Sequence, residues 1–311
     1  MSRWSTLLMD SAQLSELPKV PVAEAFRHAD LVAAQRPVPL DLYRRWEQQQ
    51  WSAEQLTFDR DRALYSNRRL PSHLKSALRD SIATFIIGEY TGLDMLGPIL
   101  TGSPDESYSL FLGTQIADET RHSRVVFRMG EEVLGLPPDP RTQLASAWQM
   151  VSPAHAELAM LETSIVRELN SRPLDYRRWL QAVTLFHFIT EGLLALVGQR
   201  ALVHLLRDVP MFDSTKSVFL AMCRDESRHI GFGLHALRTG MAEGHAETIY
   251  EVLEKAVPLV FRFDSEFSNI STEFHDMTTT MARRHLTSIG ADQQFANHLM
   301  APWERRTKEA S

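Results

Sequence analysis

The sequence predicts an all-α protein, on three observations. Most of its 311 residues fall in apolar segments with helical periodicity, and Pro and Gly separate these segments. Strand signals are nearly absent, because no Asn-Gly or Asp-Gly hairpin turn stands between alternating runs. Four of the long segments also carry acidic side chains among apolar neighbours. A bundle of helices with charged groups in its core accounts for all three.

The predicted helices follow one another along the chain. Four long helices are expected at 71–101, 106–134, 173–207 and 213–240, and Pro71 opens the first. A helix at 141–170 separates the two pairs, which is the order of a ferritin-like four-helix bundle with a long crossover. Additional flanking helices are expected at 22–34 and 40–50, and two or more between 244 and 307. No low-complexity linker divides the chain, so residues 1–311 are expected to form a single domain.

A repeated pentapeptide is the most informative motif. Residues 118–122, Asp-Glu-Thr-Arg-His, return as Asp-Glu-Ser-Arg-His at 225–229. Each copy holds a Glu and a His three positions apart, and on a helix these side chains lie on one face. A single Glu-x-x-His is common on solvated helices, but two copies in one pentapeptide favour two halves of one metal site. The metal-binding helices then span about 71–240.

Two further glutamates complete the predicted site. Glu89 lies 30 residues before Glu119, Glu191 lies 35 before Glu226, and both stand inside apolar runs. A lone carboxylate is costly to bury, and a pair of cations would offset that cost. Carboxylate and imidazole ligands favour iron or manganese. The predicted ligands of two metal ions, Fe/Fe or Mn/Fe, are Glu89, Glu119, His122, Glu191, Glu226 and His229.

Neighbouring polar residues are candidates for supporting roles. Asp118 and Asp225 precede the ligand glutamates and can accept the second ring N–H of the histidines. Arg121 and Arg228 could pair with those carboxylates or face solvent. His187 lies one turn before Glu191 and is interpreted as a hydrogen-bonded or core histidine near the site.

The bulk composition limits the partners. A formal charge of −6 gives no basic footprint for nucleic acid, and the single Cys223 excludes an intramolecular disulfide. The first twenty residues lack a signal peptide pattern, so a cytoplasmic protein is expected. The most apolar windows, 82–100 and 185–197, carry Glu89 and Glu191 and are interpreted as core helices without a membrane span.

With these motifs, the chain resembles the ribonucleotide reductase small-subunit superfamily. Residues 51–62, Trp-Ser-Ala-Glu through Arg-Asp-Arg, are similar to the segment that precedes the first ligand helix in that superfamily. The resemblance implies that Trp51 hydrogen-bonds Asp225, which holds His122, and that this path feeds electrons to the site. By this interpretation only one of the two repeats has such a path.

The sequence departs from the reductase subunits at the tyrosines. Val126 stands at the position of their radical Tyr, and no Tyr follows Tyr250. The chain is more similar to the small-subunit-like ligand-binding oxidases, which bind a long-chain fatty acid and cross-link a Tyr to a Val. Phe186 and Gly92 replace those two residues here, so that cross-link cannot form. Met222 replaces an additional His of the arylamine N-oxygenases.

The resulting functional hypothesis is an O₂-activating dinuclear oxidase or oxygenase. Its substrate would be an apolar or amphipathic small molecule, with a long-chain fatty acid as one option, and its partners an electron donor and a second copy in a homodimer. The alternatives are a non-catalytic metal- or fatty-acid-binding or redox-sensing protein, a divergent reductase subunit and an amine N-oxygenase. The residues expected to line the substrate cavity are Phe85, Gly92, Phe186 and His187.

Overall fold

The computed structural model describes residues 12–206, 212–267 and 272–309, which form helices without any β-strand. The all-α fold class is therefore confirmed. The α-helices are α2 (Val22–Ala34), α3 (Pro39–Gln48), α4 (Asp59–Ser66), α5 (Ser72–Thr101), α6 (Glu106–Glu132), α7 (Pro140–Trp148), α8 (Pro153–Ser171), α9 (Tyr176–Val183), α10 (Leu196–Leu206), α11 (Asp213–Ala242), α12 (Ala246–Phe267), α13 (Thr272–Ile289) and α14 (Gln293–Glu309). Two 3₁₀ turns, η1 (Leu17–Lys19) and η2 (Ala53–Gln55), and a π-helical segment, η3 (Thr184–Ala195), complete the described elements.

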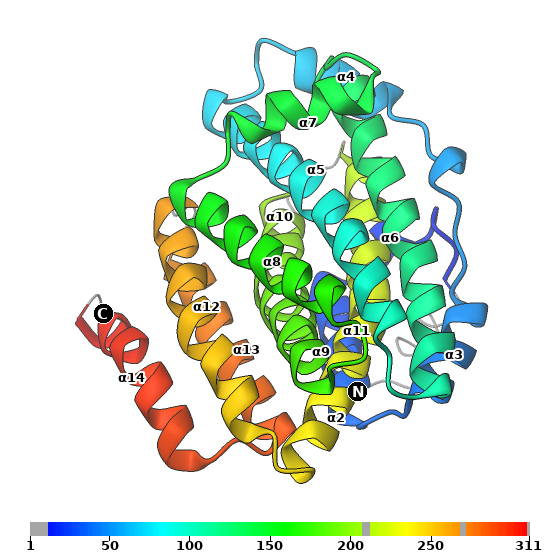
Figure 1. The fold of residues 1–311 in the computed structure, drawn as a ribbon. Coiled ribbons are helices and arrows are strands. Elements are labelled where there is room, and N and C mark those ends of the chain that lie inside the picture. The colour runs from blue at the N-terminus through cyan, green and yellow to red at the C-terminus, as the bar shows by residue number, and fades with distance from the viewer. Residues whose placement is uncertain (1–11, 207–211, 268–271, 310–311) are drawn as a thin grey trace.

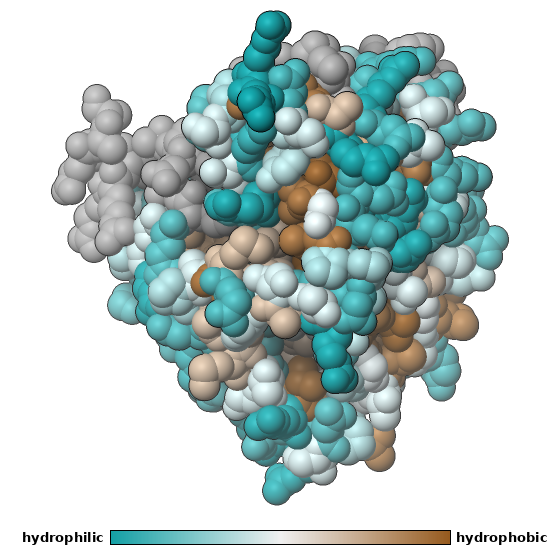
Figure 2. Space-filling view, turned by 90° about the horizontal axis from the view of Figure 1, so that it is seen from above, coloured by the Kyte–Doolittle hydropathy of each residue, from teal (hydrophilic) through white to brown (hydrophobic). Residues whose placement is uncertain are grey.

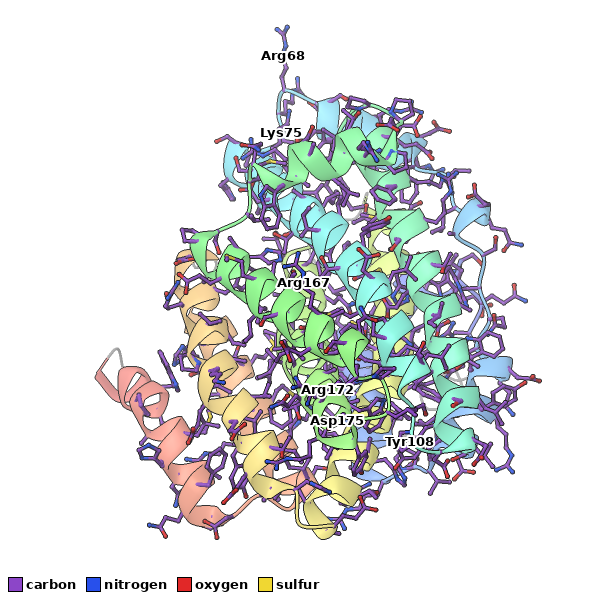
Figure 3. All side chains as sticks on the ribbon, viewed as in Figure 1. Arg68, Lys75, Tyr108, Arg167, Arg172 and Asp175 are labelled. Atoms are coloured by element: carbon purple, nitrogen blue, oxygen red, sulfur yellow. The ribbon has the colours of Figure 1, made fainter. Side chains whose placement is uncertain are left out.

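Four long elements form the core bundle: α5, α6, α11 and the continuous run from η3 into α10 (Figure 1). The turn between α5 and α6 is short because Asp105 caps α6. Its carboxylate accepts hydrogen bonds from the backbone N–H groups of Ser107 and Tyr108. Tyr108, labelled near the start of α6 in Figure 3, packs against Trp179 of α9 and Phe232 of α11 and so joins both halves of the bundle.

The single helix predicted at 141–170 is wrong, because the chain forms two helices there, α7 and α8. Pro153 explains the break. It disfavours a helical backbone at the residue before it, and it has no N–H to continue a helix. Ser152 instead caps α8, since its hydroxyl accepts a hydrogen bond from the backbone N–H of His155 at 3.2 Å. The crossover helix α8 then runs across the bundle in front of α10 (Figure 1).

The helix predicted at 173–207 is present from Tyr176 to Leu206, but its centre is π-helical. The wider turn of η3 surrounds Glu191, and such distortions are frequent at functional sites. This run is also long and apolar enough to cross a membrane, yet 78% of its most apolar window is buried in the fold. Its apolar surface is therefore used for packing within the protein.

The flanking helices cover the core bundle. Helices α2 and α3 pack on α11 and α6, while α12 and α13 pack on η3. Because α11 has neighbours on all sides, nearly every side chain from Thr215 to Leu237 is buried. The surface in Figure 2 is mostly hydrophilic, with hydrophobic side chains gathered near its middle. The charged residues of the bundle core are thus shielded from solvent.

Candidate metal centre

The six predicted ligands converge from four elements. Glu89 comes from α5, Glu119 and His122 from α6, Glu191 from η3, and Glu226 and His229 from α11. None is more than 5% exposed. Carboxylates withdrawn from water in this way need cations or protons as partners.

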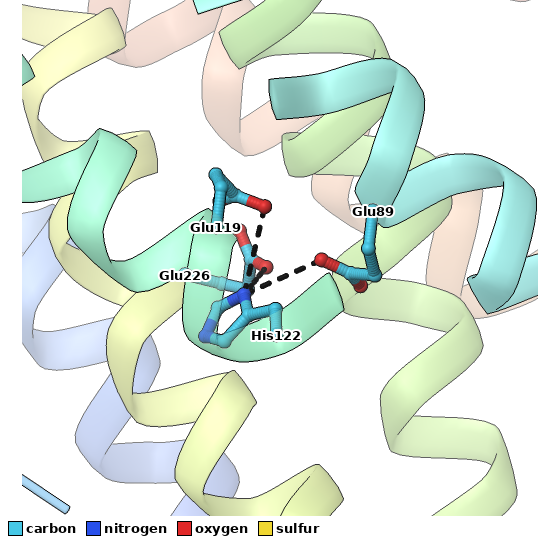
Figure 4. Close-up of side chains that lie close together, drawn as sticks. All are labelled: Glu89, Glu119, His122 and Glu226. Carbon is cyan, nitrogen blue, oxygen red and sulfur yellow. Dashed lines mark ion pairs between the residues drawn. The ribbon is translucent and has the colours of Figure 1, made fainter. Parts of the chain in front are cut away.

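The six side chains form two overlapping clusters, and each can hold a metal ion. Nδ1 of His122 lies 3.3 Å from Glu89, 3.6 Å from Glu119 and 3.6 Å from Glu226, as the dashed lines in Figure 4 show. In the second cluster, Nδ1 of His229 lies 3.2 Å from Glu119, 3.2 Å from Glu191 and 3.4 Å from Glu226. Glu119 and Glu226 belong to both clusters, so they are placed to bridge two ions.

The oxygens of the shared glutamates divide between the clusters. Glu119 directs Oε2 towards His122 and Oε1 towards His229. Glu226 directs Oε1 towards His122 and Oε2 towards His229. Both Nδ1 atoms are buried without a hydrogen-bond partner, as are Oε1 of Glu119 and Oε2 of Glu226. Buried polar atoms are normally satisfied. Orphaned atoms that face one another across one space therefore fit a pair of metal ions, in agreement with the predicted cofactor.

The pKa values of the buried ligands also favour metal binding. Burial raises the pKa of Glu191 to about 8, and burial also raises the pKa of Glu89 well above its usual value. Burial acts against the charge on His229 as well, but Glu191, Asp118 and Glu119 together raise its pKa well above its usual value. Without metal, the cluster therefore holds protons that divalent cations would displace.

The two aspartates cross between the repeats. Nε2 of His122 lies 3.1 Å from Oδ2 of Asp225, and Nε2 of His229 lies 3.1 Å from Oδ2 of Asp118. Each aspartate thus orients the histidine of the other pentapeptide and leaves its Nδ1 facing the glutamates. Arg228 joins the two halves, because its Nη2 atom donates to Asp118 at 2.7 Å and to Asp225 at 2.6 Å.

The expected hydrogen bond of Trp51 is present. Its Nε1 donates to Oδ2 of Asp225 at 2.7 Å, and the same oxygen contacts His122. The expectation that the other repeat lacks such a path is wrong. Trp46 Nε1 donates to Oδ1 of Asp118 at 2.9 Å, so Trp46, Asp118 and His229 form a second chain of contacts. This second chain could not be predicted from sequence, because Trp46 reaches Asp118 only when α3 packs on α6.

Two glutamines support the ligands. Nε2 of Gln115 donates to Glu191 at 2.7 Å, and its Oε1 lies 3.1 Å from Nε2 of His187. Gln199 donates to Glu226 at 3.3 Å. His187 therefore acts through Gln115, as a hydrogen-bonded histidine near the site. One signal for Gln115 was available, since it lies one helical turn before Glu119.

An apolar cavity of about 100 Å³ adjoins the cluster. Its lining includes all four predicted ligand glutamates together with Phe85, Gly92 and Phe186. His187 is not part of the lining, so that prediction is wrong: its ring packs against Phe232 on α11 instead. The space beside Gly92 is used by the protein itself, because a Cβ there would lie 3.2 Å from the Phe186 ring.

The bundle and its carboxylate–histidine clusters define a ferritin-like protein. The sequence model of the family described as "Ribonucleotide reductase, small chain" matches residues 29–298, so the chain belongs to that family. A variant of an R2-like ligand-binding oxidase with aerobically reconstituted Mn/Fe cofactor is similar at a TM-score of 0.65 and 18% identity, covering 88% of this chain and 93% of that one. Another variant, anaerobically reconstituted, has a TM-score of 0.71 at 17% identity over 82% and 95% of the two chains. At these identities the likeness shows a shared fold.

Proposed function

We propose that this protein is an O₂-activating dinuclear oxidase or oxygenase that acts on an apolar or amphipathic small molecule. The observation that carries the proposal is the pair of bridged clusters opening on an apolar cavity. An Fe/Fe or Mn/Fe pair, when bound, would supply the binding and reduction of O₂. The Mn/Fe cofactors named for the similar oxidases support this choice of metals.

The residues of the chain would have distinct parts in this reaction. Glu89, Glu119, His122, Glu191, Glu226 and His229 would fix the ligand geometry. Asp118 and Asp225 would keep the two imidazoles oriented, and Trp51 with Asp225 would carry electrons or protons from an external donor. Phe85 and Phe186 would exclude water and hold a substrate C–H or N–H bond near the metals. We further propose a cytoplasmic homodimer.

Ribonucleotide reduction is not the function we propose. Val126, at the position of the radical Tyr in the reductases, is completely buried and carries no group that could hold a radical. A family relationship therefore does not imply the reductase reaction here.

Oxygen consumption by the loaded protein tests the proposal. Protein loaded with iron or with manganese and iron is reduced anaerobically and mixed with O₂ in a stopped-flow oxygen assay. We expect fast consumption of O₂ and an optical change at the metals. Glu191→Gln should slow both, whereas Glu168→Gln, an exposed change on α8, should slow neither. Slow O₂ uptake equal in all three proteins would instead indicate a binding or sensing role.

A further inference from the structure

The cavity has a second polar region, on the wall that α8 provides. His155, Leu158 and Glu162 all line the cavity and lie on one face of α8, since they are three and four residues apart. Glu162 is 4% exposed, and its Oε1 lies 2.7 Å from the hydroxyl of Thr190. This carboxyl group is separate from the six predicted metal ligands, and sequence reasoning missed it.

Glu162 is a buried acid without a cation. Among the described residues, the Thr190 hydroxyl is the one hydrogen-bond partner of the Glu162 side chain, and no Lys, Arg or His forms an ion pair with it. Burial raises its pKa to about 7, with only the Thr190 hydrogen bond acting against that rise. Arg167 on α8 and Arg172, which caps its C-terminal end, are both exposed, and Figure 3 labels both. A buried carboxylate normally has a cationic or metal partner. A bound ligand with a positive charge would supply that partner for Glu162.

The rest of the lining indicates which ligand. Five glutamates line the cavity, and no Lys or Arg does so among the described residues. Four of these five belong to the predicted metal site, where the ions would balance their charge, so Glu162 is the acid of the lining that is left without a cation. His155 adds no positive charge, because burial lowers its pKa to about 4, and its Nδ1 is buried without a hydrogen-bond partner. These groups suit a ligand whose head group donates hydrogen bonds, and they do not suit an anionic head group.

We propose that the cavity binds a small amphipathic amine, with its ammonium group held by Glu162 and its apolar part between Phe85, Phe186 and Leu158. This inference rests on the proposed function, because it names the substrate class for the same cavity. A carboxylate head group, such as that of a fatty acid, would be repelled at Glu162. Thr190 orients the Glu162 carboxylate from η3, next to the predicted ligand Glu191.

Calorimetry on protein loaded with redox-inert Zn²⁺ tests the proposal without turnover. The probes are n-hexylamine, hexanoate and 1-hexanol, which share one chain length. We expect hexylamine to bind best. Glu162→Gln keeps the acceptor for Thr190 but removes the charge, so it should weaken hexylamine binding about tenfold or more. Glu162→Asp should restore part of it, and the exposed change Glu168→Gln should have no effect.

Three results would overturn the proposal: hexanoate binding as tightly as hexylamine, hexylamine binding unchanged in Glu162→Gln, or no binding of any probe. Zinc content measured on each variant shows whether the variant has folded and filled its metal site. The oxygen assay separates this test from the proposed function. Hexylamine binding without O₂ consumption would contradict the proposed oxidase function. O₂ consumption without hexylamine binding would contradict the proposed amine ligand.

Discussion

Asp118 and Asp225 each orient the histidine that belongs to the other pentapeptide. The side chain of Arg228 contacts both aspartates, so the two ligand sets are held by one shared network. A change at one aspartate should therefore disturb a histidine on the opposite helix. The resemblance implied that Asp225 holds His122, but the matching contact between Asp118 and His229 was not predicted, because it depends on how α6 and α11 pack.

The second tryptophan leads to a prediction about electron supply. The Arg121 guanidinium lies 5.2 Å from the Trp51 ring, and this positive charge should make Trp51 harder to oxidise. Trp46 should then carry part of the electron flow. We expect Trp51→Phe and Trp46→Phe each to slow anaerobic reduction of the metals by a chemical donor, and the double variant to slow it about tenfold or more. Stopped-flow reduction measures this.

Trp148→Phe provides the control for these variants, because Trp148 is an exposed tryptophan on α7. Its reduction rate should equal that of the wild type. If Trp46→Phe also leaves the rate unchanged, alone and in combination with Trp51→Phe, then the contact with Asp118 is structural only.

The Glu162 carboxyl group predicts a pH dependence of stability. Its pKa of about 7 in the folded protein lies above the usual 4.5, so the folded state keeps a proton that the unfolded state releases. Its contribution to stability therefore falls as pH rises from 4.5 to 7 and is lost above 7. Glu162→Gln lacks this titration. Relative to wild type, the variant should gain about 1–3 kcal/mol between pH 4.5 and 7.5, measured by denaturant unfolding. A difference that does not change with pH would show that Glu162 is ordinarily solvated.

At the scale of elements, the π-helical segment depends on close helix contacts. Gly233 on α11 lets η3 approach, because a Cβ at that position would lie 2.1 Å from the Cβ of His187. His187 in turn contacts Gln115, which holds Glu191. The glycine therefore affects the position of a predicted metal ligand without touching the metals.

A pair of glycine substitutions tests this packing. Gly233→Ala should destabilise the protein by about 1–3 kcal/mol, because neither backbone can move away easily. Gly113→Ala on α6 meets nothing within 4 Å and should stabilise it by about 0.5–1 kcal/mol. Denaturant unfolding of both variants gives the two values. Equal effects would mean that the contact between η3 and α11 is loose.

The sequence predicted most elements because their signals are local. Apolar periodicity and capping residues such as Asp105 identify the long helices and their ends. The break before Pro153 was missed, although Ser152-Pro153 is itself a local signal. The π turn around Glu191 could not be predicted, since it depends on packing against α11, α12 and α13.

At the scale of the whole molecule, the fold brings distant parts of the chain to one buried site. The ligands span positions 89 to 229, and the flanking helices α2, α3, α12 and α13 shield them. The sequence predicted this site because few arrangements of four helices can bring a duplicated pentapeptide and two buried glutamates together. It did not predict Glu162 or Trp46, because their contacts join the bundle to helices that carry no ligand motif.

Metal content is the most direct test of the central claim. After anaerobic loading and removal of free metal, wild type should hold about two equivalents of iron or manganese per chain. Glu119→Gln should lose both, because Glu119 belongs to both clusters, whereas Glu191→Gln should keep about one. Glu168→Gln should match wild type. A wild type without tightly bound metal, or a Glu119→Gln protein that still holds both ions, would contradict the account.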